Sequence, residues 1–453
     1  MESIPDATSS LLNFADVKRR AVSSRCYRVK VPTSNGTTFT PGNTMNLDLA
    51  GNMANSYYSM EQSYLLMTIK NSAAATNDFT LDGRVGGYGL INRLQVITGG
   101  QTISDITNFN KLAAALMTQN TGNEWSMNVG SNLIGSSVGG SAFGGLTVAG
   151  AAAGGTSERI ALPFILTALA NTTPQRYIPA FSRDMLRFRF YTETQALGGT
   201  ATGAGAAPVI TFEDVEAVMY IVELSPDAQA LVNAMTGGVY NILCGDYRAA
   251  NATFLGAGAA TTQVFTLGFA VSSLERVIIV QQDAASQVAA KNSVSARITG
   301  TLEEYTLIIN GEQLPSRPIR CDGTISTQGY GAESFAETLV AQHSLSDFSH
   351  NAQFSAVAGV GVANKAVLDG TGGNGDGTNE AKTGQFVAAV ELESMAGKSS
   401  NLYSGISTIG AICQARMVYS AAPAITNSLV FYAQNTILLS LDMNGLGTYV
   451  VSV

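Results

Sequence analysis

The chain has 453 residues and a formal net charge of −8, and only 13% of its residues are charged while 45% are hydrophobic. An acidic chain argues against a generally basic nucleic-acid-binding protein. Average globular proteins carry about 25% charged residues, so small polar residues must cover much of this surface. Charges are depleted at interface cores, so the composition predicts burial against copies or other subunits, although a β-protein with small-residue loops has the same composition.

Residues 1–24 are predicted to form an N-terminal arm, with a short helix over "SSLLNFADVKRR" (9–20). Charge runs are usually solvated, but this arm can also face an anionic surface or hold a neighbouring subunit. The opening "MESIPDATSS" lacks the basic and apolar regions of a secretory signal, and the apolar runs are too short to span a membrane. Six of the 25 basic residues lie within the first 30 positions: Lys18, Arg19, Arg20, Arg25, Arg28 and Lys30.

The segment 90–117 changes its period partway along. Residues 90–98 alternate as in a strand, Gly99-Gly100 allows a tight turn, and "QTISDI" predicts a returning strand. After Asp105 the spacing becomes helical, and Asp105 is the predicted N-cap because its carboxylate can accept from free amides of the first turn. The expected apolar face of this helix consists of Ile106, Phe109, Leu112, Ala113, Leu116 and Met117.

Short alternating segments, rich in β-branched and aromatic residues, predict two tandem β-sandwiches. A helix over 225–235, with Ser225 as its cap and Pro226 at its first position, marks the boundary. The predicted domains are 25–235 and 236–453. The first contains strands at 26–31, 44–49, 63–70, 90–98, 186–193 and 215–224, and the second at 263–270, 274–281, 294–301, 304–311, 385–393, 412–419, 428–443 and 447–453.

Two further features concern the relation of the halves. Asn310-Gly311 favours a primed hairpin turn in the second half, and "YGLINRLQVI" (88–97) weakly resembles "VSSLERVIIV" (271–280).

The runs 121–157 and 356–384 are rich in Gly, Ala, Ser and Asn and show no period. Long segments of this kind are usually functional surfaces or disordered, so we expect one exposed loop in each half.

No pattern in the sequence predicts catalysis, a metal site or a cofactor. His343 and His350 have no partner at ligand spacing, and neither a nucleophile motif nor a phosphate-binding loop occurs. The oxygens of loop 368–380 can approach a divalent cation, but their order is not that of an EF-hand, which favours an ordinary loop tip. The cysteines lack CxxC spacing and are expected to be buried free thiols: Cys26, Cys244, Cys321 and Cys413.

The combination of hairpin, helix and long loop within tandem β-sandwiches resembles the double jelly-roll major capsid proteins of tailless icosahedral DNA viruses of the adenovirus-like lineage. Residues 89–117 look most like the polinton-like virus and virophage branch, where an "L-I-x-R-x-x-V" strand precedes a "D-I-x-x-[FY]-N-x-L" helix. Weaker support comes from 401–417 and 439–453. The resemblance implies an all-β fold of two jelly rolls with a few short helices in the connections.

The resemblance also implies a structural role without enzymatic activity. Three chains would form a homotrimer with a pseudo-hexagonal outline, and these capsomers would tile the shell of a virion beside penton and minor capsid proteins. The arm residues Lys18, Arg19, Arg20 and Arg25 would face the interior, toward the genome or an internal membrane. Two alternatives stay open: a tandem β-sandwich capsid protein of a single-stranded DNA or RNA virus, and a glycan-binding surface protein, although the long loops hold few aromatic residues.

Overall fold

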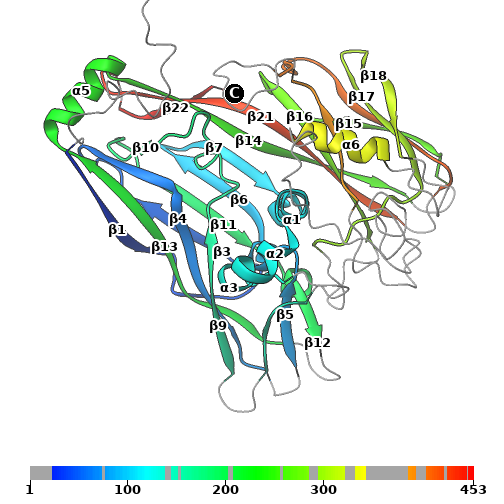
Figure 1. Ribbon diagram of the computed structural model, residues 1–453, viewed down its shortest axis with the longest axis horizontal. Helices are drawn as coiled ribbons and strands as arrows, with labels where there is room; N and C mark the ends of the chain where they lie inside the picture. Colours follow the sequence, from blue (N-terminus) through cyan, green and yellow to red (C-terminus); the bar gives the residue numbers. More distant parts are fainter. Residues whose placement is uncertain are drawn as a thin grey trace, which may run out of the picture.

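The protein consists of two jelly rolls joined side by side (Figure 1). The computed structural model describes residues 23–73, 77–137, 144–150, 155–202, 208–255, 259–284, 294–321, 332–342, 386–393, 405–422, 426–445 and 447–452. All sheets are antiparallel. Each roll closes two sheets over a core, an arrangement that leaves few sheet edges exposed.

The first jelly roll pairs one sheet of order β1-β13-β4-β10 with a second of order β3-β11-β6-β7. Strands β2 and β9 extend the first sheet, and a smaller sheet has the order β12-β5-β8. The strands are β1 (Ser24–Pro32), β2 (Thr38–Phe39), β3 (Thr44–Leu49), β4 (Ser56–Asn71), β5 (Asp78–Asp82), β6 (Ile91–Thr98), β7 (Gln101–Thr107), β8 (Gly144–Val148), β9 (Thr156–Pro163), β10 (Ile178–Pro179), β11 (Leu186–Thr192), β12 (Gly199–Thr202) and β13 (Ile210–Leu224).

The second jelly roll repeats this plan with sheets β14-β21-β16-β19 and β15-β20-β17-β18, and β22 pairs with β21. In each roll a long strand near the C-terminal end of the roll, β13 or β21, lies beside the first strand. The strands are β14 (Val239–Phe254), β15 (Thr262–Leu267), β16 (Leu274–Asp283), β17 (Leu302–Ile309), β18 (Glu312–Arg320), β19 (Ala388–Glu391), β20 (Cys413–Tyr419), β21 (Asn427–Asp442) and β22 (Tyr449–Ser452).

The strand orders show that the two similar segments, 88–97 and 271–280, are not an internal repeat. The third position of the β3-β11-β6-β7 sheet is matched by β17, whereas β16 takes the place of β4. Segments 88–97 and 271–280 therefore do not occupy equivalent positions. The true counterpart of the Gly99-Gly100 hairpin is the Asn310-Gly311 hairpin, and both turns have positive φ at both residues, as predicted.

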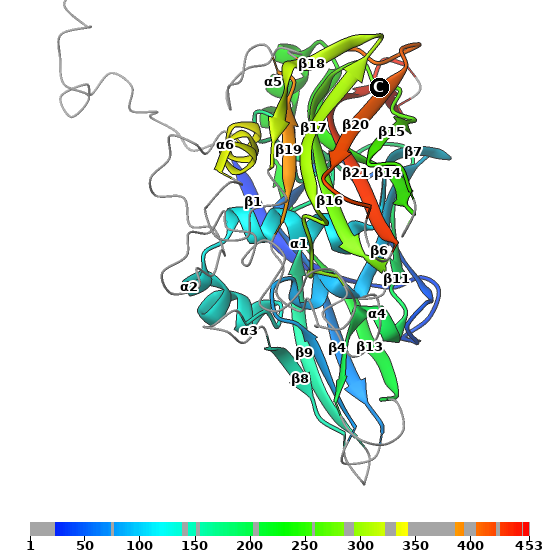
Figure 2. The ribbon, with the colours of Figure 1, turned by 90° about the vertical axis from the view of Figure 1, so that its right-hand side faces the viewer.

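Helix α1 (Phe109–Asn120) follows β7 as predicted, but its N-cap is Asn108 rather than Asp105. Asp105 lies within β7, where its carboxylate accepts from the Arg93 guanidinium at 2.7 and 2.6 Å. This cross-strand ion pair engages the Asp105 carboxylate away from the helix amides. The helix is also buried on nearly every side rather than on one face, because it lies between the two rolls (Figure 2).

The second predicted helix is confirmed as α5 (Pro226–Thr236). The Ser225 hydroxyl accepts from the Ala228 amide, and Gly237 ends the helix with φ of 63°. Helix α6 (Ala332–Ala341) follows the second hairpin and was not predicted. Five short helical elements complete the described chain: η3 (Gly86–Leu90), α2 (Asn123–Trp125), the π-helix η4 (Ser126–Gly130), α3 (Ser131–Leu133) and α4 (Gln195–Gly198).

Two other predictions fail in part. Residues 294–301 form no strand; the amide of Gln282 donates to the carbonyls of Val294 and Ala296 and holds this segment in an irregular path. The run 121–157 is not a plain loop, since it includes α2, the π-helix Ser126–Gly130, α3 and β8. Ile134 within it is fully buried. The second run, 356–384, lies outside the described residues.

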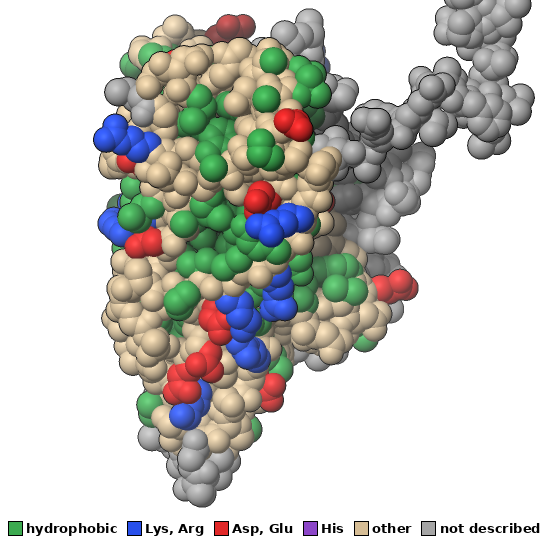
Figure 3. Space-filling view, turned by 90° about the vertical axis from the view of Figure 1, so that its left-hand side faces the viewer, with side chains coloured by type: hydrophobic (Ala, Val, Ile, Leu, Met, Phe, Trp, Pro, Cys, Tyr) green, Lys and Arg blue, Asp and Glu red, His purple; other side chains and the backbone are tan. Residues whose placement is uncertain are grey.

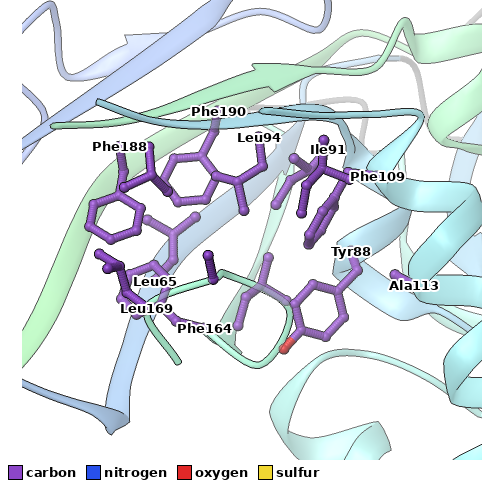
Figure 4. Close-up of a cluster of buried hydrophobic side chains, with 14 of the residues drawn as sticks. Leu65, Tyr88, Ile91, Leu94, Phe109, Ala113, Phe164, Leu169, Phe188 and Phe190 are labelled. Carbon is purple, nitrogen blue, oxygen red and sulfur yellow. The ribbon is translucent and has the colours of Figure 1, made fainter. Parts of the chain in front are cut away.

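The core of the first roll is rich in aromatic side chains. Phe164 stacks against Phe188 at a ring separation of 5.4 Å, and Tyr88 meets Phe109 of α1 edge-on (Figure 4). Buried residues of both rolls join one hydrophobic cluster, whereas a second cluster belongs to the second roll alone. The two rolls thus pack against each other through a shared hydrophobic core, which fixes their relative position.

The contact between the rolls also buries charge. Arg84 and Arg297 are fully buried, and Asp82 supplies a carboxylate whose charge favours the ionised form of both. Asp82 also accepts from the backbone amides of Arg84 and Ser295, across the contact. Burial is the main effect and lowers the pKa of Arg84 to about 10 and that of Arg297 to about 9, so both stay protonated at neutral pH.

Candidate assembly surfaces

The outer face of the β1-β13-β4 sheet carries a strip of exposed ion pairs. Lys30 lies 2.8 Å from Glu216, Arg159 lies 3.5 Å from the other oxygen of Glu216, and a third pair joins Lys70 to Glu213. Figure 3 shows basic and acidic side chains close together on the lower half of this side of the molecule. Exposed pairs contribute about 0–1 kcal/mol each, so the strip does little to hold the fold together.

Of the four basic residues predicted to face the interior, the structure describes only Arg25. It lies in β1, and its guanidinium donates to Glu223 of β13 at 2.9 and 2.7 Å, which raises the pKa of Arg25. Arg25 is therefore part of the sheet rather than of a separate arm. Lys18, Arg19 and Arg20 lie outside the described residues, so their orientation stays a prediction.

A groove of about 570 Å³ lies on the same face, where β4 and β13 approach α5 and the start of β14. Figure 3 shows hydrophobic side chains gathered over the middle of this face. Glu61 and Arg176 bring one charge of each sign to the groove. Its apolar lining includes Met60, Leu169, Val222, Leu224, Val232 and Ile242.

The walls of the groove are fixed by hydrogen bonds. Gln229, on the inner side of α5, accepts from the Tyr57 hydroxyl at 2.9 Å and donates to the Tyr240 hydroxyl at 2.9 Å. Tyr57 belongs to β4 and Tyr240 to β14, so these two hydrogen bonds connect α5 to both rolls. Burial raises the pKa of Tyr57 well above its usual range, which keeps this hydroxyl a donor at neutral pH.

Sequence reasoning missed this groove, although one signal was present. Along β13 the inward positions are Val215, Ala217, Met219 and Ile221, yet Val222 and Leu224 add apolar side chains to the other face. Apolar side chains on both faces of a strand indicate that other parts of a protein pack against both faces there.

Further apolar side chains are exposed beside the groove. Leu231 of α5 is 63% exposed and Met235, one turn later, is 79% exposed. Val239, Met443 and Val450 are exposed at the nearby ends of β14, β21 and β22. Exposed apolar side chains that gather in one region can mark an interaction site.

The described residues offer little for catalysis or metal binding. They contain no group of three or more His, Cys, Asp and Glu side chains arranged to hold a metal ion. Both histidines and the 368–380 loop lie outside the described residues. Cys244, Cys321 and Cys413 are buried free thiols, as expected, whereas Cys26 is exposed. Within the described ranges, no helix has the length and apolar character needed to cross a membrane.

Two jelly rolls in tandem that share one hydrophobic core define a double jelly-roll protein.

No protein-family model matches the chain, and no curated protein matches it in sequence. Solved structures do match its fold. Vp54 of the virus PBCV-1 aligns over 97% of this chain and 99% of its own, at 12% identity and a TM-score of 0.61.

Two further solved structures extend this similarity. The Faustovirus major capsid protein aligns over 96% of this chain and 93% of its own, at 10% identity and a TM-score of 0.60. A chain of the Sputnik virophage aligns over 98% and 92%, at 12% identity and a TM-score of 0.54. The predicted double jelly-roll fold is confirmed, and it is shared with viral major capsid proteins.

Proposed function

We propose that this chain is a major capsid protein, a structural subunit of an icosahedral virus shell and not an enzyme. One observation carries the proposal: both jelly rolls, in their tandem order, align with the Faustovirus major capsid protein over 96% of the chain. The fold alone can host many functions. The exposed apolar side chains around α5 add support, because a shell subunit covers such surface with its neighbours.

In this proposal three chains form a homotrimer, and six sandwiches give it a pseudo-hexagonal outline. The sandwiches correspond to residues 25–235 and 236–453, which meet at the end of α5. Capsomers then contact one another, penton proteins and minor capsid proteins within the virion. The 13% charged content suits a subunit that neighbours cover on several sides.

The arm residues Lys18, Arg19 and Arg20 are proposed to face the shell interior, with Arg25 at the root of the arm. There they can meet a neighbouring capsomer, packaged nucleic acid or anionic lipid. Each basic residue near an anionic membrane contributes roughly 1 kcal/mol, so three of them bias orientation without dominating assembly. Replacing the three with Ser should leave trimers intact and reduce the yield or stability of complete particles; particles at wild-type yield and stability would show that the arm is a solvated tail.

Mass measurement by light scattering, combined with negative-stain microscopy, tests the assembly proposal. We expect a trimer or a shell, and a stable monomer would argue against a capsid role. The trimer should survive a change from low salt to about 0.5 M, because apolar contacts are not weakened by screening of exposed charges. Dissociation by salt alone would show that ion pairs hold it instead.

A further inference from the structure

We propose that the groove beneath α5 binds the N-terminal arm of its own chain through the apolar residues Leu11, Leu12 and Phe14. Docking would hold the basic cluster Lys18–Arg20 at this end of the molecule.

The chain enters the described structure directly beside the groove. Ser24 pairs with Leu224 across β1 and β13, and the backbone amide of Ser225 donates to the Ser23 carbonyl at 2.9 Å. Leu224 is itself part of the groove lining. The arm therefore starts at the groove rather than at a distant point on the surface.

The length of the arm suffices for docking. Phe14 precedes Ser23 by nine residues, and an extended chain covers up to about 3.3–3.6 Å per residue, or roughly 30 Å. This reach allows the arm either to cross the groove or to turn back into it. A short tether also raises the local concentration of the apolar segment at the groove, so weak contacts suffice.

The chemistry of the two partners matches. The groove is lined mainly by apolar side chains, and the arm carries Leu11, Leu12 and Phe14 within four consecutive positions. The exposed Glu61 faces solvent at the groove, while the arm supplies Lys18, Arg19 and Arg20. Arg176 is the basic residue of the lining, and the arm carries the acidic residue Asp16.

The groove is also preformed. Gln229 accepts from Tyr57 and donates to Tyr240, and these hydrogen bonds hold α5 above the sheet, so binding does not require the walls to reorganise. A rigid site binds a flexible segment with a smaller ordering cost than a site that must also fold. Only the arm loses conformational entropy on binding.

Limited trypsin digestion of the full-length protein tests the proposal, because trypsin cuts after Lys18, Arg19 and Arg20. Val232→Gln places an amide in the groove. The matched control, Leu231→Gln, changes the preceding residue of α5, which is 63% exposed and does not line the groove. We expect Val232→Gln to speed cleavage at the arm at least fivefold, with no change for Leu231→Gln. Equal arm-cleavage rates in wild type and both variants would overturn the proposal.

A disulfide test identifies the occupant even if Val232→Gln destabilises α5. In a Cys26→Ser background, Leu12→Cys combined with Val232→Cys should cross-link within one chain under mild oxidation. Leu12→Cys combined with Val264→Cys, an exposed position on β15 of the second roll, is the control. Cross-links between chains would show that a second copy supplies the arm, and yields equal to the control would show that no arm binds; either result overturns the proposal.

Discussion

The two jelly rolls share one strand order but use the helix after their hairpin differently. Helix α1 of the first roll contacts β6 and η3 of its own roll and β16 of the other, and it is buried along most of its length. Helix α6 of the second roll packs on β19 and β18 of its own roll, and most of its residues are half-buried or exposed. The same element thus joins the two rolls in one case and covers a single sheet in the other.

The start of α1 shows how this joint is made. Asn108 adopts a left-handed conformation without a side-chain cap, yet its carbonyl accepts from the Tyr432 hydroxyl of β21 at 2.8 Å. Its side-chain amide donates to Asn251 of β14 at 2.9 Å. The second roll therefore supplies partners for the first turn of a helix that belongs to the first roll.

The largest effect should come from the charge buried at this joint. Asp82→Ala leaves Arg84 and Arg297 buried without the carboxylate that favours their charged forms, and breaking a buried pair in this way costs about 3–5 kcal/mol. Urea unfolding followed by tryptophan fluorescence measures the loss. Arg297→Met in the Asp82→Ala background should recover part of it, and no recovery would show that the cost is not electrostatic.

Matched truncations of the two helices sharpen the comparison directly. Leu112→Ala in α1 removes a fully buried side chain and should lower the free energy of unfolding by about 2–5 kcal/mol. Leu339→Ala in α6 removes a half-buried side chain, so its cost should be nearer 1 kcal/mol. Equal costs in thermal or urea unfolding would mean that the second roll depends on its helix as strongly as the first.

A smaller effect concerns the pH dependence of the joint. Asp246 of β14 lies against Ser104 of β7, and burial raises the pKa of its carboxyl to about 6 despite that hydrogen bond. The folded state then holds the proton more tightly than the unfolded state, whose pKa is near 3.8. Stability from this group is therefore complete below about pH 4 and is lost as the pH rises through 6.

The substitution Asp246→Asn should remove this component and stabilise the protein above pH 6 by about 1–2 kcal/mol. Glu391 of β19 provides a control inside the second roll, since burial raises the pKa of its carboxyl to about 7. Glu391→Gln should leave the component near pH 6 in place. A melting profile across pH 4–8 that is identical in wild type and Asp246→Asn would contradict the assignment.

The smallest effect is expected at the surface. Arg25→Ser breaks the exposed pair with Glu223, and such pairs contribute little because water and salt screen them. We expect an unchanged melting temperature at both low salt and 0.5 M salt. A clear loss at low salt would place Arg25 among the residues that hold β1 on its sheet.

Local sequence patterns predicted the elements whose signals are local. The β6–β7 hairpin, α5 with its Ser225 cap and the Asn310-Gly311 turn depend on neighbouring residues and were predicted correctly. Strand β14 was missed because it mixes apolar residues with Gly245, Asp246 and Asn251, and it forms only because β21 pairs with its whole length. The cap at Asp105 failed for the same reason, since a cross-strand arginine competes for the carboxylate.

The assembly surfaces were harder to predict than the fold. The basic arm is visible as a run of charges, but the groove combines residues from β4, β13, α5 and β14, which only the closed fold brings together. Arg84 and Arg297 lie far apart in the sequence, and nothing around either residue indicates complete burial. Such features follow from tertiary packing and not from periodicity.

The unbroken pairing of β14 with β21 has a mechanical consequence. The strands remain in register from Val239 opposite Asp442 to Phe254 opposite Asn427, over about 50 Å at 3.3 Å per residue. In contrast, β13 and β4 shift register twice. Tension applied along the ribbon loads all its hydrogen bonds together, whereas tension across one end opens them in turn. Single-molecule pulling from residues 239 and 427 should therefore need more force than pulling from 239 and 442, because the first pair loads the ribbon along its stronger direction.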